Sequence, residues 1–139
     1  MKKKFIIFFI ISFIYIVFFP ILKEKVLDKD YYFTLETEGL KNDKSLGTEI
    51  WLDHIEVDGK EYDMSKIVRP EGFEYNGRLY CTGEVPASLT TVIKYKHSIK
   101  FVFIKHPYSG IVIFTGFGQK CSIDLYSDEQ ETFSYSYER

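Results

Sequence analysis

The sequence predicts an all-β domain, an antiparallel β-sandwich of which a jelly roll is one form, behind one N-terminal transmembrane helix. Of the 139 residues, 25 are aromatic and Ala87 is the single alanine, and this balance favours strands over helices. After residue 30 the apolar residues recur with a period of two, and no window of a dozen residues shows a helical period of 3.6. Residues 5–22, in contrast, form one apolar run.

The apolar run predicts an uncleaved membrane anchor. Of the 18 residues 5–22, 16 are apolar, and as a helix they would span about 27 Å, close to the thickness of the hydrocarbon core of a bilayer. Three lysines, residues 2–4, precede the run as in an export signal, but the run ends without the small residues at which a signal is cleaved. A cleaved signal is the alternative. We expect contact with the lipid bilayer through residues 5–22.

The charged residues around the anchor predict its orientation and the domain limits. A short basic tail stays inside while a folded domain is translocated, so we expect a single-pass cell-membrane protein with its domain outside the cytoplasm. The chain then divides into a tail and anchor (residues 1–22), a charged tether (23–30) and a β-sandwich ectodomain (31–139). Residues 23–139 carry 15 Lys and Arg against 20 Asp and Glu, which argues against nucleic acid as a partner. The abundance of Ile, Lys, Phe and Tyr beside a single Ala favours a bacterial source.

Short strands with frequent turn signals follow one another through the ectodomain. Asp58-Gly59 and Asn76-Gly77 are typical of tight hairpin turns, and residues 39–47 form a polar loop between two glycines. Eight or nine strands of this kind are typical of a sandwich. In chain order, strands are expected at residues 31–36, 48–57, 73–75, 79–81, 89–96, 99–104, 111–115 and 120–126, with a ninth at 132–137, and the chain returns from the Asp58-Gly59 turn through residues 61–62.

The strand at residues 48–57 changes phase in its middle. The apolar positions begin on Ile50 and Leu52 and then shift to Ile55, which a side-chain period of two cannot produce without an extra residue. We therefore predict a β-bulge near Asp53. With Ile50 and Leu52 in the core, Trp51 faces outward; the alternative is a core Trp51 with the bulge one residue earlier.

An outward Trp51 indicates contact with a ligand. An apolar sugar face can lie on an indole while a carboxylate at the rim, such as that of Asp53, accepts hydrogen bonds from hydroxyl groups. Among the tyrosines, Tyr108 is the candidate to complete the surface. The predicted ligand-binding residues are therefore Trp51, Asp53 and Tyr108.

Residues 99–104 and 111–115, joined by the turn 105–110, are predicted to form an apolar strand pair. Both faces of the first strand are apolar, with Phe101 on one face and Val102 on the other. Such a strand is either central and covered on both sides, or its outer face is a contact surface.

No motif predicts a catalytic centre, a metal site or a cofactor. The three histidines lack zinc-binding spacing, and Ser109 lies in a turn without the G-x-S-x-G pattern. The carboxylates are expected to form a solvated surface. Cys81 and Cys121, the only cysteines, both fall in predicted strands. They either form a disulfide, which an extracytoplasmic site permits, or serve as small buried apolar residues.

Three segments resemble β-sandwich modules, similar to galactose-binding-like jelly rolls, that lie outside the membrane region of bacterial cell-envelope proteins. The segments are residues 47–59 (GTEIWLDHIEVDG), 99–110 (IKFVFIKHPYSG) and 122–127 (SIDLYS). Because some of those modules accompany glycan-handling membrane enzymes, the resemblance implies an accessory role near envelope glycans and carries over no catalytic residue.

The expected function is that of a non-enzymatic, membrane-anchored extracytoplasmic module that binds an envelope glycan or another membrane protein. Two alternatives belong to other classes. One is an enzyme that acts on envelope sugars through the carboxylates of residues 49–63. The other is a structural or assembly subunit whose apolar strand pair packs on a partner.

Overall fold

The computed structural model describes residue 16 and residues 29–67 and 72–139. The predicted membrane anchor, residues 5–22, lies outside the described residues except for Ile16. No helix within the described part of the chain is both long and apolar enough to cross a membrane.

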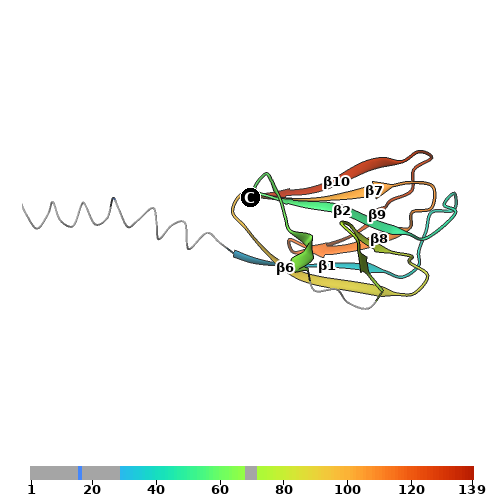
Figure 1. Cartoon of the computed structure of the whole chain (residues 1–139), viewed down its shortest axis with the longest axis horizontal. Helices are drawn as coiled ribbons and strands as arrows, with labels where there is room; N and C mark the ends of the chain where they lie inside the picture. The colour runs from blue at the N-terminus through green and yellow to red at the C-terminus, as the bar shows by residue number, and fades with distance from the viewer. Residues whose placement is uncertain (1–15, 17–28, 68–71) are drawn as a thin grey trace, which may run out of the picture.

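The described residues form two antiparallel sheets that face each other (Figure 1). One has the order β6-β1-β8-β9, and the other has the order β10-β7-β2-β5-β4 with β3 beside β2. The strands are β1 (Lys29–Thr37), β2 (Ile50–Val57), β3 (Lys60–Glu61), β4 (Glu74–Tyr75), β5 (Leu79–Cys81), β6 (Ala87–Tyr95), β7 (Ser98–Lys105), β8 (Ile111–Gly116), β9 (Gln119–Asp124) and β10 (Glu131–Glu138), and one 3-10 turn, η1, spans Met64–Lys66.

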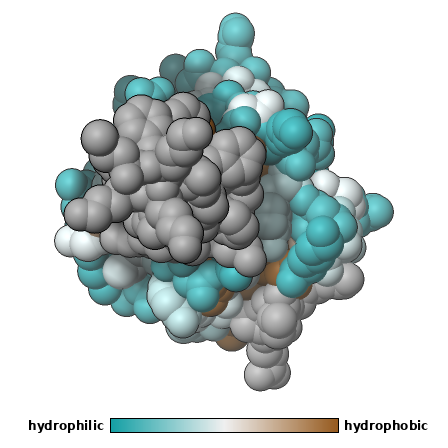
Figure 2. Space-filling model, turned by 90° about the vertical axis from the view of Figure 1, so that its left-hand side faces the viewer, coloured by the Kyte–Doolittle hydropathy of each residue, from teal (hydrophilic) through white to brown (hydrophobic). Residues whose placement is uncertain are grey.

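The prediction of an all-β sandwich is confirmed, and each predicted strand is found with ends that differ by two residues at most. The strands of the described residues divide into four and six, whereas a jelly roll has eight. The predicted tether, residues 23–30, extends too far, because Lys29 and Asp30 belong to β1, where they are paired with Tyr95 and Lys94. Figure 2 looks onto this end, and the described residues visible there are mostly hydrophilic.

Alternating side chains from both sheets fill the space between them. In β6, for example, Leu89 and Ile93 are buried while the residues between them are partly or fully exposed. At the centre, the ring of Phe101 contacts those of Phe33 and Phe114, with centroids 4.7 and 5.0 Å apart. Burial of each of these rings stabilises the fold by about 1.5–3 kcal/mol.

The predicted β-bulge is confirmed. The register of β2 against β7 shifts between Leu52 and His54. Ile50, Leu52 and Ile55 are all fully buried, because the extra residue returns Ile55 to the core side. Trp51 therefore lies on the outer face of the six-stranded sheet and not in the core.

The prediction that residues 99–104 and 111–115 form a pair of neighbouring strands is wrong. The strands β7 and β8 lie in different sheets, because the turn between them crosses from one layer to the other. Strand β7 lies between β2 and β10, so the alternative of a central strand is the correct one. Its outward side chains Val102 and Ile104 are only 5% and 6% exposed, beside His54 and Trp51 of β2. They offer little apolar surface to a partner.

Cys81 and Cys121 are free thiols, so the disulfide alternative is not formed. Cys81 ends β5, whereas Cys121 of β9 contacts Tyr135 of β10. In the six-stranded sheet β5 and β10 are three strand spacings apart, about 14 Å, and a disulfide requires Cα atoms within about 7 Å. Cys81 instead serves as a small buried apolar residue, which was the other alternative. Burial raises the pKa of its thiol to about 11.

We expect two free thiols per chain in protein recovered from its native compartment. The distance between the sheet positions of Cys81 and Cys121 prevents pairing within the folded domain. Labelling of the unfolded, unreduced full-length chain with a thiol reagent, followed by mass spectrometry, measures this number. A chain that gains no label until it is reduced would contradict the arrangement of the strands.

Candidate functional site

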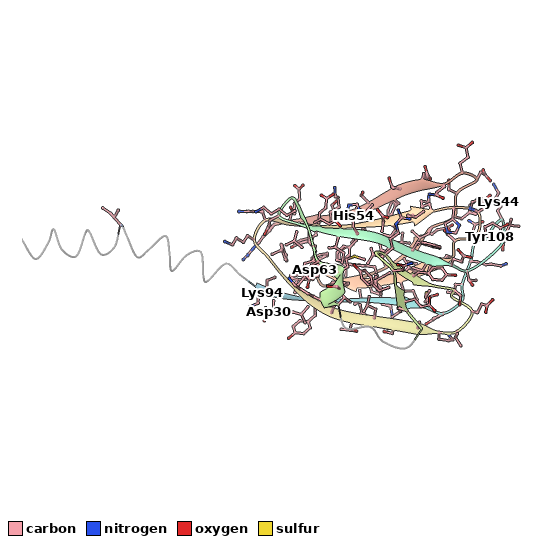
Figure 3. The ribbon with its side chains drawn as sticks, viewed as in Figure 1. Asp30, Lys44, His54, Asp63, Lys94 and Tyr108 are labelled. Carbon is pink, nitrogen blue, oxygen red and sulfur yellow. The ribbon has the colours of Figure 1, made fainter. Side chains whose placement is uncertain are left out.

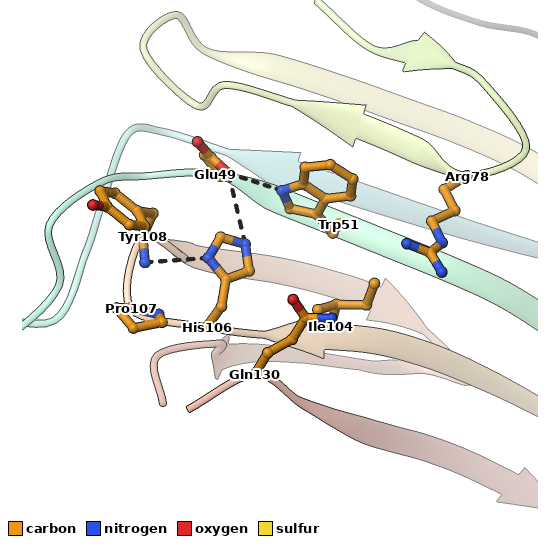
Figure 4. Close-up of a pocket in the computed structure, with 8 residues that line it drawn as sticks. All are labelled: Glu49, Trp51, Arg78, Ile104, His106, Pro107, Tyr108 and Gln130. Carbon is orange, nitrogen blue, oxygen red and sulfur yellow. Dashed lines mark hydrogen bonds and ion pairs between the residues drawn. The ribbon is translucent and has the colours of Figure 1, made fainter. Parts of the chain in front are cut away.

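A hollow of about 370 Å³ opens on the outer face of the six-stranded sheet (Figure 4). The start of β2, the end of β7 and the turn that follows β7 form its walls, and Arg78 from the β4–β5 turn stands at its rim. Figure 3 places Tyr108, which lines this hollow, at one end of the sandwich, and Asp30 and Lys94 at the other. The site therefore lies far from the point at which the chain enters β1.

The indole of Trp51 forms one side of this hollow. Trp51 is paired with Tyr80 of β5 and with Ile104 of β7, and it is half-buried. Its ring lies 4.6 Å from the ring of Tyr80 at an angle of 52°. The indole Nε1–H donates a hydrogen bond of 2.9 Å to Oε2 of Glu49, which points to the same face two residues earlier in the chain. The orientation of the indole is thus fixed by a neighbouring ring and by a carboxylate.

His106 lies on the other side of the Glu49 carboxylate. Its Nδ1 accepts a hydrogen bond of 3.2 Å from the backbone N–H of Tyr108, so the ring carries its proton on Nε2. This Nε2 lies 3.6 Å from Oε2 of Glu49. The backbone of Glu49 is held as well, because its N–H donates to the carbonyl of Tyr108 and its carbonyl accepts from Gly110. The carboxylate is therefore positioned before any ligand arrives.

Asp53 lies beside this hollow in a row of alternating charges. Its carboxylate pairs with Nε of Arg78 and with Nδ1 of His54, the second at 2.8 Å. His54 continues the row to Glu56 at 3.3 Å, and Glu56 pairs with Lys100 at 2.7 Å. Burial alone would lower the pKa of His54, but its hydrogen bonds to the two carboxylates, together with their charges, outweigh burial and raise it. Asp53 is thus engaged by Arg78 and His54 and does not line the hollow.

Of the three predicted ligand-binding residues, the structure brings Trp51 and Tyr108 together at the hollow and leaves Asp53 beside it. Tyr108 is 52% exposed. Sequence reasoning named Glu49 only among the carboxylates of the enzymatic alternative, not beside Trp51, and it missed His106 as a member of the site. Glu49 could have been found, since residues two apart on a strand share a face. The approach of His106, 57 positions later in the chain, depends on tertiary structure.

Two of the other carboxylates between residues 49 and 63 have structural roles. Asp58 accepts three backbone hydrogen bonds from the β6–β7 turn, and Asp63 caps η1 through the N–H of Ser65. Within residues 29–67 and 72–139, no three His, Cys, Asp or Glu side chains are grouped so that they could hold a metal ion.

The arrangement suits a ligand ring that has both an apolar face and polar edges. It combines an aromatic surface, a fixed hydrogen-bond acceptor and a guanidinium in a shallow hollow, which is the usual composition of a binding site for a small polar ring. No family model, curated protein or solved structure matches this chain.

Proposed function

We propose that this chain is a membrane-anchored, extracytoplasmic β-sandwich module that binds a cell-envelope glycan at Trp51 and catalyses no reaction. The observation that carries the proposal is the indole of Trp51, half-buried at a hollow and held by Glu49. An aromatic ring at the surface of a strand exposes apolar area to water unless something covers it. A sugar ring covers it well, because its C–H face lies on the indole while its hydroxyl groups reach the polar rim.

The position of the hollow supports a ligand that lies away from the bilayer. The proposed anchor precedes β1, and β1 begins at the end of the sandwich opposite to Tyr108 (Figure 3). A domain tethered through residues 23–28 then presents Tyr108 and the hollow on the side remote from the lipid. This arrangement fits a ligand in the cell envelope better than a lipid headgroup.

The side chains at the hollow favour binding over hydrolysis. Canonical glycoside hydrolysis uses two carboxyl groups on either side of the scissile bond. Among the described residues that line this hollow, Glu49 is the one carboxylate, and it is held by Trp51. Asp53, the acidic residue of β2 that comes first after Glu49 in the chain, is engaged by Arg78 and His54.

A second candidate function, the binding of a membrane-protein partner, is favoured by the edge strand β10. It pairs with β7 over eight consecutive residues without a register shift. It contains no proline and no lysine, the residues that commonly protect an edge from pairing with another chain. A partner could add an extended strand at this edge.

Replacement of Trp51 by alanine is expected to lower the affinity for soluble cell-wall glycan fragments at least tenfold, equal to about 1.4 kcal/mol. The free energy of unfolding should fall by only about 1 kcal/mol, because the side chain packs on the outer face and not in the core. Calorimetry on the full-length chain in detergent measures the affinity, and thermal unfolding measures the stability.

Tyr32→Ala is the matched control for this experiment. Tyr32 is an aromatic residue that is 67% exposed, but it lies on β1 in the opposite sheet. Its replacement should leave glycan affinity unchanged. Equal affinity of the wild-type chain and Trp51→Ala for every fragment tested would refute the proposed function.

A further inference from the structure

A further hollow flanks the indole of Trp51, beside the one described above. The second has a volume of about 300 Å³ and lies toward β4 and β5. Trp51 and Arg78 line both hollows. The larger one holds the carboxylate of Glu49, and the smaller one holds that of Glu74 beside Tyr80. A sugar ring stacked on the indole would thus have the carboxylate of Glu49 on one side and that of Glu74 on the other.

The charges around the two hollows do not cancel. The guanidinium of Arg78 is paired with Asp53, which lies just outside the lining. His106 accepts the N–H of Tyr108 at Nδ1 and so presents no proton at that nitrogen. The carboxylates of Glu49 and Glu74 therefore leave the lining with an excess of negative charge.

The pKa of Tyr80, whose ring lies beside the indole, reflects this negative charge. The pKa of Tyr80 is raised, first by its burial and next by the charges of nearby anionic groups that include Glu49 and Glu74. The ring of Tyr80 lies 4.6 Å from that of Trp51, so the same field acts at the indole. The excess of acidic residues over residues 23–139 adds to it at longer range.

We propose that the saccharide bound at Trp51 carries a free, protonated amino group, so that the site selects an amino sugar over its N-acetylated form. This inference rests on the proposed function. A cation over the face of a tryptophan is attracted by the ring, and it is attracted further by a carboxylate at the edge. Acetylation of the nitrogen removes both interactions and leaves only the stacking of the sugar ring.

The test compares two saccharides that share one backbone, the tetrasaccharide of chitosan with free amines and the tetrasaccharide of chitin with acetylated ones. Trp51 is the single tryptophan of the chain, so its fluorescence reports on this site in the full-length protein. At a pH where the amines are charged, we expect the chitosan fragment to bind at least tenfold more tightly. The preference should shrink between about 0.1 M and about 1 M salt.

Two variants separate charge from folding. Glu49→Gln keeps an oxygen that can accept the indole N–H, and Glu74 is exposed, so Glu74→Gln does not disturb the core. Each should lower the affinity for the chitosan fragment at least threefold and leave that for the chitin fragment unchanged. Glu61→Gln, which neutralises an exposed carboxylate on β3 away from both hollows, is the control and should change neither.

The outcomes distinguish this inference from the proposed function. Equal or tighter binding of the chitin fragment would overturn the selection of an amino sugar and leave glycan binding intact. Equal binding of a lysine tetrapeptide would overturn the saccharide as the source of the charge. If neither tetrasaccharide binds, the inference fails, and the proposed function fails with it only if cell-wall fragments also fail to bind.

Discussion

Gly83→Ala is expected to destabilise the domain by more than about 4 kcal/mol, an exceptional cost for a single methyl group. A Cβ atom at Gly83 would overlap the carbonyl oxygen of Thr48 and lie 2.8 Å from its carbonyl carbon. Both are backbone atoms, which cannot move aside as a flexible side chain does. The backbone of Gly83 also has a φ of +69°, a conformation that costs an L-residue about 1–2 kcal/mol by itself.

Gly77→Ala is the matched control for this variant. Gly77 has a similar φ of +76°, but a Cβ atom there would meet nothing within 4 Å. Its replacement should therefore cost only the conformational part, about 1–2 kcal/mol. Thermal unfolding of the two full-length variants, followed by the fluorescence of Trp51, gives the comparison. Equal costs would show that the contact between residue 83 and Thr48 is not as close as the structure has it.

The contact at Gly83 also affects the candidate site. Thr48 immediately precedes Glu49, and its hydroxyl donates a hydrogen bond of 2.9 Å to the carbonyl of Thr82. A displacement of Thr48 by an added methyl group would move Glu49 and, through the indole N–H, Trp51. Any Gly83→Ala protein that folds should thus bind glycan fragments more weakly than Gly77→Ala protein does.

Much of the fold could be predicted because its signals are local. A period of two, the Asp58-Gly59 turn and the phase change between Leu52 and Ile55 each involve residues close in the chain. The division into sheets could not be predicted in this way. Whether β7 pairs with β8 depends on where the turn at residues 105–110 leads the chain, and β7 instead pairs with β2 and β10.

The candidate site was predictable to the same extent. The outward direction of Trp51 follows from the phase of one strand, and the structure places Trp51 on that face. The sequence predicts Asp53 at the rim of the ligand site, but in the structure its carboxylate pairs with Arg78. Arg78 comes from a hairpin 25 positions later, so this pairing is not visible in the sequence. His106 reaches Glu49 because the turn after β7 forms an isolated parallel β-bridge between Ser109 and Glu49, a contact between distant residues.

Asp58→Ala is expected to lower the free energy of unfolding by about 2–3 kcal/mol, the range for loss of hydrogen bonds to a charged group. The carboxylate of Asp58 accepts backbone N–H groups from Lys96, His97 and Ser98 at 2.9, 2.7 and 3.0 Å. It thereby joins the β2–β3 turn to the β6–β7 turn and satisfies three donors that alanine would leave without this partner.

Asp58→Asn and Asp63→Ala are the controls. Asparagine tolerates the positive φ of +51° at position 58 and retains one acceptor oxygen, so it should cost less than alanine. Asp63 also accepts a backbone hydrogen bond, but it caps only the short turn η1, and its removal should cost about 1 kcal/mol. Urea unfolding of the full-length variants measures all three. A similar cost for Asp58→Ala and Asp63→Ala would contradict the role of Asp58 as a link between two turns.

The cost of Asp58→Ala should depend on pH in a defined direction. Burial alone would raise the pKa of Asp58, but the three backbone N–H donors outweigh it, so the pKa in the folded protein lies below the ordinary value. A carboxylate of this kind stabilises the fold fully above its unfolded pKa of about 3.9 and loses that contribution as the pH falls through the folded pKa. The difference between wild type and Asp58→Ala should be largest near neutral pH and should shrink in acid. A difference that stays constant down to the acid transition would mean that the shape of Asp58, and not its charge, holds the two turns together.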